Sequence, residues 1–125
     1  MAEPNRSWTQ QRGHEAEVAA CRYLCSQGLV FVEQNFRCKH GELDLIMTVT
    51  DVLVFVEVRQ RPHSHFGTAI ESVTPAKCRK IARAAAYFLQ SNRAFREHVC
   101  RFDVIGACNR NDKWEFDWIP DAFRL

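Results

Sequence analysis

Two acidic residues in apolar surroundings, Asp44 and Glu57, are the residues of this sequence best suited to carry chemistry. Glu57 lies inside the run Val-Phe-Val-Glu-Val, where an ionised side chain is costly unless a strong partner is supplied. Two carboxylates about 5 Å apart repel each other by roughly 3 kcal/mol at an effective dielectric of about 20. A hard cation such as Mg²⁺ or Mn²⁺ removes that repulsion and takes carboxylate oxygens, a backbone carbonyl and waters as ligands. The acidic pair therefore predicts a divalent metal site.

A metal in this position predicts hydrolysis of a phosphodiester. Water bound to such an ion loses its proton more readily, and the same ion draws charge from a phosphate oxygen. Arg59 follows Glu57 by two residues, so strand alternation brings both side chains to one face of a sheet. From there the guanidinium can clamp the scissile phosphate. The pattern predicts Asp44, Glu57 and Arg59 as catalytic residues.

The elements that must position these residues are two strand-like runs, residues 42–49 and 52–59. Runs of this kind with so short a connection predict a β-hairpin. A loop of two residues and a loop of four residues give the same register. In that register Asp44 faces Glu57 and Glu42 faces Arg59, so that each pair shares one face of the hairpin.

The same residues also fit a second interpretation, a cross-strand ion network on a solvated sheet face. Such a network needs neither metal nor substrate, and here it would comprise Glu42, Asp44, Glu57, Arg59 and Arg61. Spacing alone does not separate the two interpretations, because clusters of acids mark structural networks as well as active sites. The apolar neighbours of Glu57 favour the metal site.

The remaining patterns predict an α/β protein in the order helix, three strands, helix, two strands. The expected segments outside the hairpin are a helix over residues 13–27, a strand over 29–34, a helix opened by Thr74 and Pro75, and strands over 101–108 and 113–119. The second helix is expected to bury Cys78, Ile81, Ala84, Ala85 and Phe88 and to turn Arg79, Arg83 and Gln90 outward.

Length and composition predict one cytoplasmic domain. A chain of 125 residues suffices for a single core, so residues 1–125 are expected to form one domain, with residues 1–11 as a flexible N-terminal segment. No apolar run is long enough to span a bilayer or to direct secretion. The six cysteines form no CxxC pair and are predicted to be free thiols. A zinc site built on Cys21, Cys25 and a histidine is the less favoured alternative.

Charge is unevenly distributed, although the net charge of the chain is only +2. Eight basic residues and a single acidic residue, Glu71, fall within residues 59–96. This segment is suited to phosphate groups, and Arg59, Arg61, Lys77 and Lys80 are the predicted nucleic-acid contacts. Simple solvation is the alternative for the basic residues of the helix and for His63 and His65. Trp8, Trp114 and Trp118 are suited to stacking on unpaired bases and, more commonly, to packing in a core or interface.

The sequence also resembles a known family over nearly its whole length. The shared motifs are Gly13-x-x-Ala16-Glu17 with Tyr23-Leu24, Asn35-Phe36-Arg37, residues 41–46 (GELDLI), residues 54–59 (VFVEVR), Phe66-Gly67, residues 74–77 (TPAK), residues 101–105 (RFDVI) and Ala122-Phe123. They are similar to those of the YraN family of small bacterial proteins, which resemble PD-(D/E)XK nucleases and Holliday-junction resolvases. The resemblance implies a restriction-endonuclease-like core, a mixed five-stranded sheet flanked by helices.

The resemblance also implies an activity, a metal-dependent DNA endonuclease that hydrolyses phosphodiester bonds, with branched DNA among its substrates. Asp44 matches the motif aspartate, Glu57 the (D/E) residue and Arg59 the motif lysine. Glu17 matches a helix glutamate that often completes the metal site, and its alternative role is an exposed helix glutamate near the positive N-terminal dipole. Resolvase-like relatives act as twofold dimers, so the oligomeric state is open between monomer and homodimer.

Arginine at position 59 is a departure from the nuclease pattern. A lysine can orient the attacking water or accept its proton, whereas Arg59 stays charged and acts only as a donor and electrostatic clamp. The alternative function is therefore a catalytically weak or inactive nucleic-acid-binding protein with the nuclease fold. A protein adaptor without salt-sensitive DNA binding is the third hypothesis.

Overall fold

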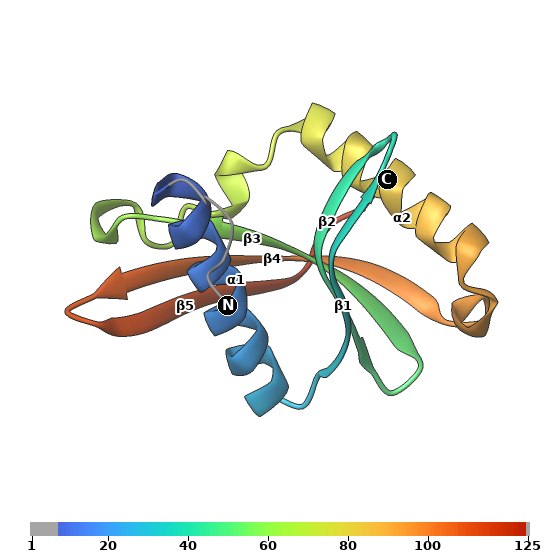
Figure 1. The fold of residues 1–125 in the computed structure, drawn as a ribbon, viewed down its shortest axis with the longest axis horizontal. Coiled ribbons are helices and arrows are strands. Elements are labelled where there is room, and N and C mark those ends of the chain that lie inside the picture. Colours follow the sequence, from blue (N-terminus) through green and yellow to red (C-terminus); the bar gives the residue numbers. More distant parts are fainter. Residues whose placement is uncertain (1–7, 125) are drawn as a thin grey trace, which may run out of the picture.

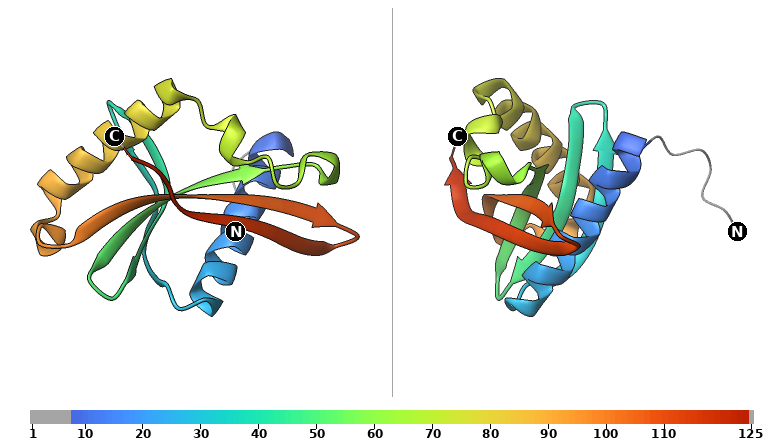
Figure 2. Two further views of the ribbon diagram at one scale, coloured as in Figure 1. Left: turned by 180° about the vertical axis from the view of Figure 1, so that it is seen from behind. Right: turned by 90° about the vertical axis from the view of Figure 1, so that its left-hand side faces the viewer.

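The fold is a twisted five-stranded sheet with one long helix on each face (Figures 1 and 2). A computed structural model describes residues 8–124, with side chains described from Gly13 onward. Its helices and strands are α1 (Trp8–Ser26), β1 (Val30–Cys38), β2 (Gly41–Val49), β3 (Val52–Gln60), α2 (Pro75–Ser91), β4 (Val99–Arg110) and β5 (Lys113–Phe123). Three short 3₁₀ turns complete the order: η1 (His63–His65), η2 (Ile70–Ser72) and η3 (Arg93–Phe95).

The sheet is mixed, as the family resemblance implies. Strand order follows the sequence, β1-β2-β3-β4-β5, and only the β3–β4 pair is parallel. A parallel pair requires a crossover connection, and the segment containing η1, η2, α2 and η3 provides it. Helix α1 crosses the opposite face (Figure 2). The predicted α/β class and element order are therefore confirmed.

Two apolar clusters lie on the two faces of the sheet because side chains alternate along β3. Phe55 points toward α2, where it meets Phe88 and Ile81. Val54 and Val56 point toward α1, where Leu24 and Ala20 are fully buried. Burial of each large apolar side chain contributes about 1.5–3 kcal/mol. These clusters fix β2 and β3 between the helices.

The β2–β3 hairpin has the predicted register. Val49 pairs with Val52, and the ladder continues to Leu45 opposite Val56. Thr50, at the turn, has φ of 51°. A β-branched residue is strained in that conformation, so Thr50-Asp51 is not a favoured turn pair.

The second helix begins where its sequence predicts. The Thr74 hydroxyl accepts a hydrogen bond from the Lys77 backbone N–H at 3.2 Å, and Pro75 occupies the first helical position. Four of the five residues expected on the inner face are buried, namely Ile81, Ala84, Ala85 and Phe88, and Cys78 is half-buried. Arg79, Arg83 and Gln90 are exposed, as expected.

Several elements are longer than their sequence patterns predicted. Helix α1 begins at Trp8 instead of Gly13, so residues 8–11 of the expected flexible segment are helical, and residues 1–7 lie outside the described residues. Strand β1 continues to Cys38, which pairs with Gly41. Strand pairing uses backbone hydrogen bonds, which polar and apolar residues form equally well. The strands therefore extend past their apolar runs.

The cysteines agree with a further expectation. All six cysteines are free thiols. Within the described part of the chain, no helix is both long enough and apolar enough to cross a membrane.

Candidate carboxylate site

Strands β2 and β3 bring the side chains of Asp44 and Glu57 together. The ladder ends at Leu45 and Val56, and Asp44 and Glu57 are the residues that follow them on the two strands. Asp44 Oδ2 accepts a hydrogen bond from the Val58 backbone N–H at 2.9 Å, which holds this carboxylate against β3. The two carboxyl groups also share a hydrogen bond. The two strands therefore bring the acids to contact range, as the sequence predicts.

Glu57 is the more unusual acid because it is buried, with 5% of its side chain exposed. Burial, the hydrogen bond to Asp44 and the negative charge of Asp44 raise the pKa of Glu57 to about 9, against the lowering effect of Lys77 and Arg59. At neutral pH the Glu57 carboxyl thus holds a proton. Replacing that proton by a metal ion would leave both groups as ligands.

Two cationic side chains lie near one carboxylate oxygen of Glu57, Oε2. Arg59 Nη2 is 3.5 Å and Lys77 Nζ is 3.6 Å from Glu57 Oε2. Both distances exceed the 2.7–2.9 Å of a tight charge-assisted hydrogen bond, so these ion pairs offset the burial of Glu57 only in part. The hollow beside the acids is lined by β2, β3 and Ile81 of α2 and leaves no volume for a water molecule.

Glu17, on helix α1, lies near Asp44. Partial burial and the negative charges of Asp44 and Glu42 raise its pKa to about 7, while a hydrogen bond to Asn35 lowers it. Asn35 has φ of 53° in β1, a conformation that asparagine tolerates better than most residues. Glu17 is therefore electrostatically coupled to Asp44. Its role as a metal ligand stays a prediction.

Glu42 does not pair with Arg59 as the hairpin register suggested. It pairs instead with Arg37 on β1, with Glu42 Oε2 3.7 Å from Arg37 Nε. The reason is that β2 has a neighbour on each side, and Arg37 is the residue opposite Glu42 in the β1–β2 ladder. The proposed five-membered ion network is thus reduced to the contact between Glu57 and Arg59.

The predicted nucleic-acid contacts fall into three environments. Arg59 and Lys77 contact Glu57. Arg61 Nη2 donates to Thr68 Oγ1 at 3.0 Å and its backbone N–H donates to Ala107, so Arg61 fixes the loop after β3. Lys80 is exposed on α2. Among these four, only Lys80 lies on the surface without an ion pair or hydrogen bond recorded within residues 13–124.

Comparisons with known proteins place the chain in a family. The model of "Uncharacterised protein family UPF0102" matches residues 16–107. The chain belongs to the UPF0102 family. A UPF0102 protein of Pseudomonas syringae pv. syringae is 49% identical over 119 residues, 94% of this chain and 97% of the relative. One of Nitrosococcus oceani is 41% identical over 116 residues, 93% of this chain and 94% of the relative.

A solved structure is a more distant match. SfsA of Pyrococcus furiosus, determined in complex with Ca²⁺, is 11% identical and superposes with a TM-score of 0.32. The alignment covers 90% of this chain and 63% of SfsA.

The donor set of this UPF0102 chain fits a hard cation bound by few protein ligands. Mg²⁺ is commonly held by one or two carboxylates, with waters and substrate phosphates in its other positions. Asp44 and Glu57 supply two carboxylates in contact. Within residues 13–124 no three histidine, cysteine or acidic side chains are grouped closely enough to hold a metal by themselves. That finding also leaves the alternative zinc site of Cys21 and Cys25 without support.

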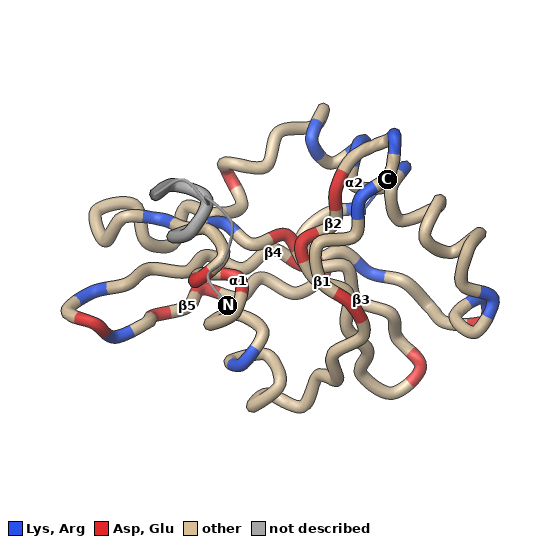
Figure 3. Tube along the Cα trace, in the orientation of Figure 1, with Lys and Arg blue, Asp and Glu red and all other residues tan. Residues whose placement is uncertain are grey.

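Figure 3 shows where the acidic and basic positions lie relative to the site. Acidic positions concentrate near the middle of the sheet, and basic positions gather at the start of α2 and the tip of the β1–β2 hairpin. These two segments are adjacent, since a Cβ on Gly41 would lie 3.6 Å from the Lys80 carbonyl oxygen. The basic segment identified from the sequence, residues 59–96, does not include Arg37 and Lys39, which the hairpin brings to this surface.

Other candidate residues have structural contacts. Asp103 is fully buried and accepts hydrogen bonds from Arg101, from Trp118 Nε1 at 2.9 Å and from the Asp121 backbone N–H at 2.9 Å. These contacts agree with its expected structural role. His63, at the exposed η1 turn, contacts Arg110 at 3.2 Å.

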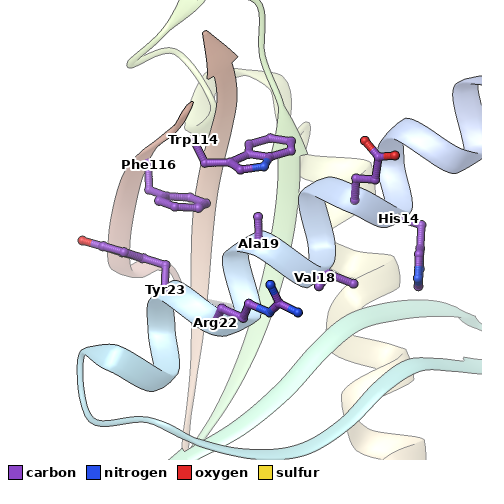
Figure 4. Close-up of a pocket in the computed structure, with 8 residues that line it drawn as sticks. His14, Val18, Ala19, Arg22, Tyr23, Trp114 and Phe116 are labelled. Atoms are coloured by element: carbon purple, nitrogen blue, oxygen red, sulfur yellow. The ribbon is translucent and has the colours of Figure 1, made fainter. Parts of the chain in front are cut away.

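A second hollow, of about 610 Å³, lies between α1 and β5 (Figure 4). Tyr23 and Phe116 stack there with ring centroids 4.6 Å apart, and Trp114 follows Phe116 at 6.4 Å. Trp118 packs on the α1 side of the core. Two of the three tryptophans thus serve in packing, and the side chain of Trp8 lies outside the described residues.

Sequence reasoning missed the contact of Lys77 with the acids, although a signal was present. Lys77 precedes Ile81 by four residues and Ala84 by seven, so it lies on the same helical stripe as the buried residues. A lysine at that phase points toward the sheet and not toward solvent. Helical periodicity would have predicted that Lys77, unlike Lys80, faces the sheet.

Proposed function

We propose that this UPF0102 chain is a metal-dependent DNA endonuclease that hydrolyses phosphodiester bonds, with Asp44 and Glu57 as the metal ligands. The observation that carries the proposal is the hydrogen-bonded carboxyl pair, buried at Glu57, with two cations beside it. An acidic residue with a purely structural role costs less free energy when it forms one tight ion pair or is exposed to water. Here burial holds one acid neutral in a position where two anionic ligands would meet a divalent ion.

Each residue of the site has a defined part in the proposed reaction. A bound Mg²⁺ or Mn²⁺ would supply a more acidic water and neutralise charge on the phosphate. Asp44, fixed by the Val58 N–H, orients one carboxylate for the ion. Glu57 would supply the second carboxylate, its proton passing to solvent as the ion binds. These two residues thereby set the position of the reacting phosphate relative to β3.

Arg59 supplies the positive charge that phosphate binding requires. Its Nε is buried and has no hydrogen-bond partner among the described residues, so this donor lacks an acceptor. A phosphate oxygen meets this need, and the planar guanidinium suits bidentate contact with phosphate. Stabilisation of the extra negative charge in the transition state is the contribution expected from Arg59.

The experiment combines metal binding with cleavage. Purified protein is titrated with Mn²⁺ by calorimetry and incubated with labelled linear, nicked and four-way DNA in Mg²⁺ or Mn²⁺. We expect Asp44→Asn and Glu57→Gln each to abolish cleavage and to weaken Mn²⁺ binding at least tenfold, because each removes one anionic ligand. Asp117→Asn on β5 is the matched control and should retain both properties. Cleavage that persists in both site variants would overturn the assignment.

A second candidate function is a nucleic-acid-binding protein that retains the fold without turnover. Arg59 in the place of lysine and the closed hollow beside the acids favour it. In that case the wild-type protein binds DNA in a salt-sensitive manner but does not cut it, and Asp44→Asn leaves DNA affinity unchanged or raises it. An adaptor for a protein partner would show no salt-sensitive DNA binding. A DNA titration across salt concentrations separates the three functions.

Branched DNA is the substrate class that we propose to compare first, because a junction presents paired scissile phosphates to a twofold dimer. Each protomer would contribute one Asp44–Glu57 site. Equal cleavage of linear and four-way DNA by a monomer would exclude this part of the proposal while leaving endonuclease activity intact.

A further inference from the structure

The position of Lys77 is determined by the start of helix α2. Thr74 caps the helix through the Lys77 backbone N–H, and Pro75 fixes the first turn. Ile81, one turn later on the same stripe, is buried against the sheet. The Lys77 side chain therefore extends over the acids, with 37% of it exposed and its Nζ 3.6 Å from Glu57 Oε2. Neighbouring Lys80 is exposed.

The charge of Lys77 acts against a divalent ion at the carboxyl pair. If Glu57 is ionised before the ion arrives, binding adds two positive charges near the ammonium group. If Glu57 carries a proton, binding exchanges that proton for the ion and adds one positive charge. The net change is positive in both cases, so the Lys77 ammonium repels the incoming ion at any protonation state of Glu57.

The space beside the acids leads to the same conclusion. The hollow that includes Asp44 and Glu57 has no volume for a water molecule, and the two cations that contact Glu57 are Arg59 and Lys77. Ligand waters of an ion therefore require a side chain to move. Lys77 is the better candidate, because its flexible four-carbon stem reaches the site from a helix surface, whereas the Arg59 Nε is buried in the strand.

We propose that Lys77 is a positioning residue that occupies Glu57 in the metal-free protein and is displaced to a phosphate oxygen when a divalent ion binds. This inference rests on the proposed metal site and gives a second role to a residue that the sequence predicts as a nucleic-acid contact. It gives the site the lysine that strand β3 lacks, supplied from helix α2. The displaced ammonium keeps a negative partner only when a phosphate is present, so the ion and the phosphate favour each other's binding.

The test is Mn²⁺ calorimetry on Lys77→Gln, Lys77→Arg and Lys80→Gln, without DNA and with a short duplex. Without DNA, Lys77→Gln should bind Mn²⁺ about three- to thirtyfold more tightly than wild type, because one competing charge is absent. Lys77→Arg keeps the charge and should remain close to wild type. Lys80→Gln removes the same charge from the exposed side of the helix and should change Mn²⁺ affinity less than twofold.

With a non-cleaved duplex present, the order of Mn²⁺ affinities among wild type and variants should change. Wild type should gain Mn²⁺ affinity from the DNA, because Lys77 finds a phosphate partner, and Lys77→Gln should lose most of that gain. Lys80→Gln should keep the gain and lose only overall DNA affinity. A change in stability alone would not move the coupling between ion and DNA, so this readout separates positioning from folding.

Acylation of lysines provides a second measurement that requires no variant. Lys77 in the metal-free protein is held against Glu57, and its reaction with acetic anhydride, followed by mass spectrometry, should accelerate when Mn²⁺ is added. Lys80 serves as the internal reference and should react at a constant rate.

The outcomes distinguish this inference from the proposed function. If wild type binds Mn²⁺ through Asp44 and Glu57 but Lys77→Gln has the same affinity as wild type, the role of Lys77 is refuted and the metal site stands. If neither wild type nor Lys77→Gln binds Mn²⁺, both proposals fail. Binding by Lys77→Gln that is weaker than binding by wild type would show Lys77 supporting the site and would also overturn the inference.

Discussion

At the scale of single residues, the site depends on the conflict between burial and charge at Glu57. The strand around it is apolar because β3 lies at the centre of the sheet, and two cations reach only one of its oxygens. The contact with Asp44 adds repulsion when both groups are ionised. Ionisable groups whose pKa departs this far from the ordinary value are frequent in functional sites.

Glu57 should make the metal-free protein less stable as pH rises. Its folded pKa is about 9, above the ordinary value of 4.5, so the folded protein binds more protons than the unfolded chain between those values. The free energy of unfolding should therefore fall from about pH 5 to pH 9, with a slope of at most about 1.4 kcal/mol per pH unit from this group. Urea unfolding at several pH values in a chelating buffer measures the slope.

Glu57→Gln provides the control for this pH dependence. Glutamine stays neutral, so the variant should lose the fall in stability above pH 5 while retaining the shape of the side chain. A variant whose stability declines with pH as steeply as that of wild type would assign the effect to another group.

At the scale of elements, one cap and one turn determine how the site is assembled. The cap on α2 directs Lys77 toward the sheet, and the turn between β2 and β3 sets the register that joins Asp44 to Glu57. A shift of one residue in that register would send one of the acids to the opposite face of the sheet. The apolar side chains of Phe55 and Ile46, buried on the α2 side, oppose such a shift.

Thr74→Ala should destabilise the protein by about 1 kcal/mol, because the Lys77 backbone N–H loses its acceptor at the start of α2. Urea denaturation measures this loss, and Thr74→Ser, which keeps the hydroxyl, should restore most of the stability. The alanine variant should also weaken the contact of Lys77 with Glu57. Equal stability of the alanine and serine variants would show that the cap contributes little.

At the scale of the whole molecule, two distant stretches of sequence form one basic surface. The tip of the β1–β2 hairpin lies against α2 near Lys80, beside the carboxylate site (Figure 3). Exposed Arg93 and Arg96 lie in and just after η3, beyond the end of α2 that is opposite to this surface (Figure 1). The fold therefore divides the basic residues of segment 59–96 between two regions.

The double variant Lys39→Gln, Lys80→Gln should weaken DNA binding and reduce the slope of log K against log salt by about two, because each lost phosphate contact contributes roughly 0.9. Fluorescence anisotropy with a labelled duplex at several salt concentrations measures the slope. Arg93→Gln, Arg96→Gln removes the same charge and should leave the slope unchanged. An equal reduction in both double variants would mean that DNA binding follows net charge and not this surface.

The sequence alone determined the α/β class, the hairpin register, the inner face of α2 and the proximity of Asp44 to Glu57. These features depend on local patterns: alternation along strands, helical periodicity and a short turn. It did not determine the true ends of β1, β4 and β5, because pairing with neighbouring strands extends them past their apolar runs.

Only the tertiary structure decided which cations meet which acids. Glu42 had two candidate partners because β2 is an inner strand with two neighbours, and its partner in the β1–β2 ladder, Arg37, forms the ion pair. Lys77 reached Glu57 through the packing of α2 on the sheet, a contact across 20 positions of sequence. Long-range contacts of this kind arise from the arrangement of whole elements, which no local pattern of residues specifies.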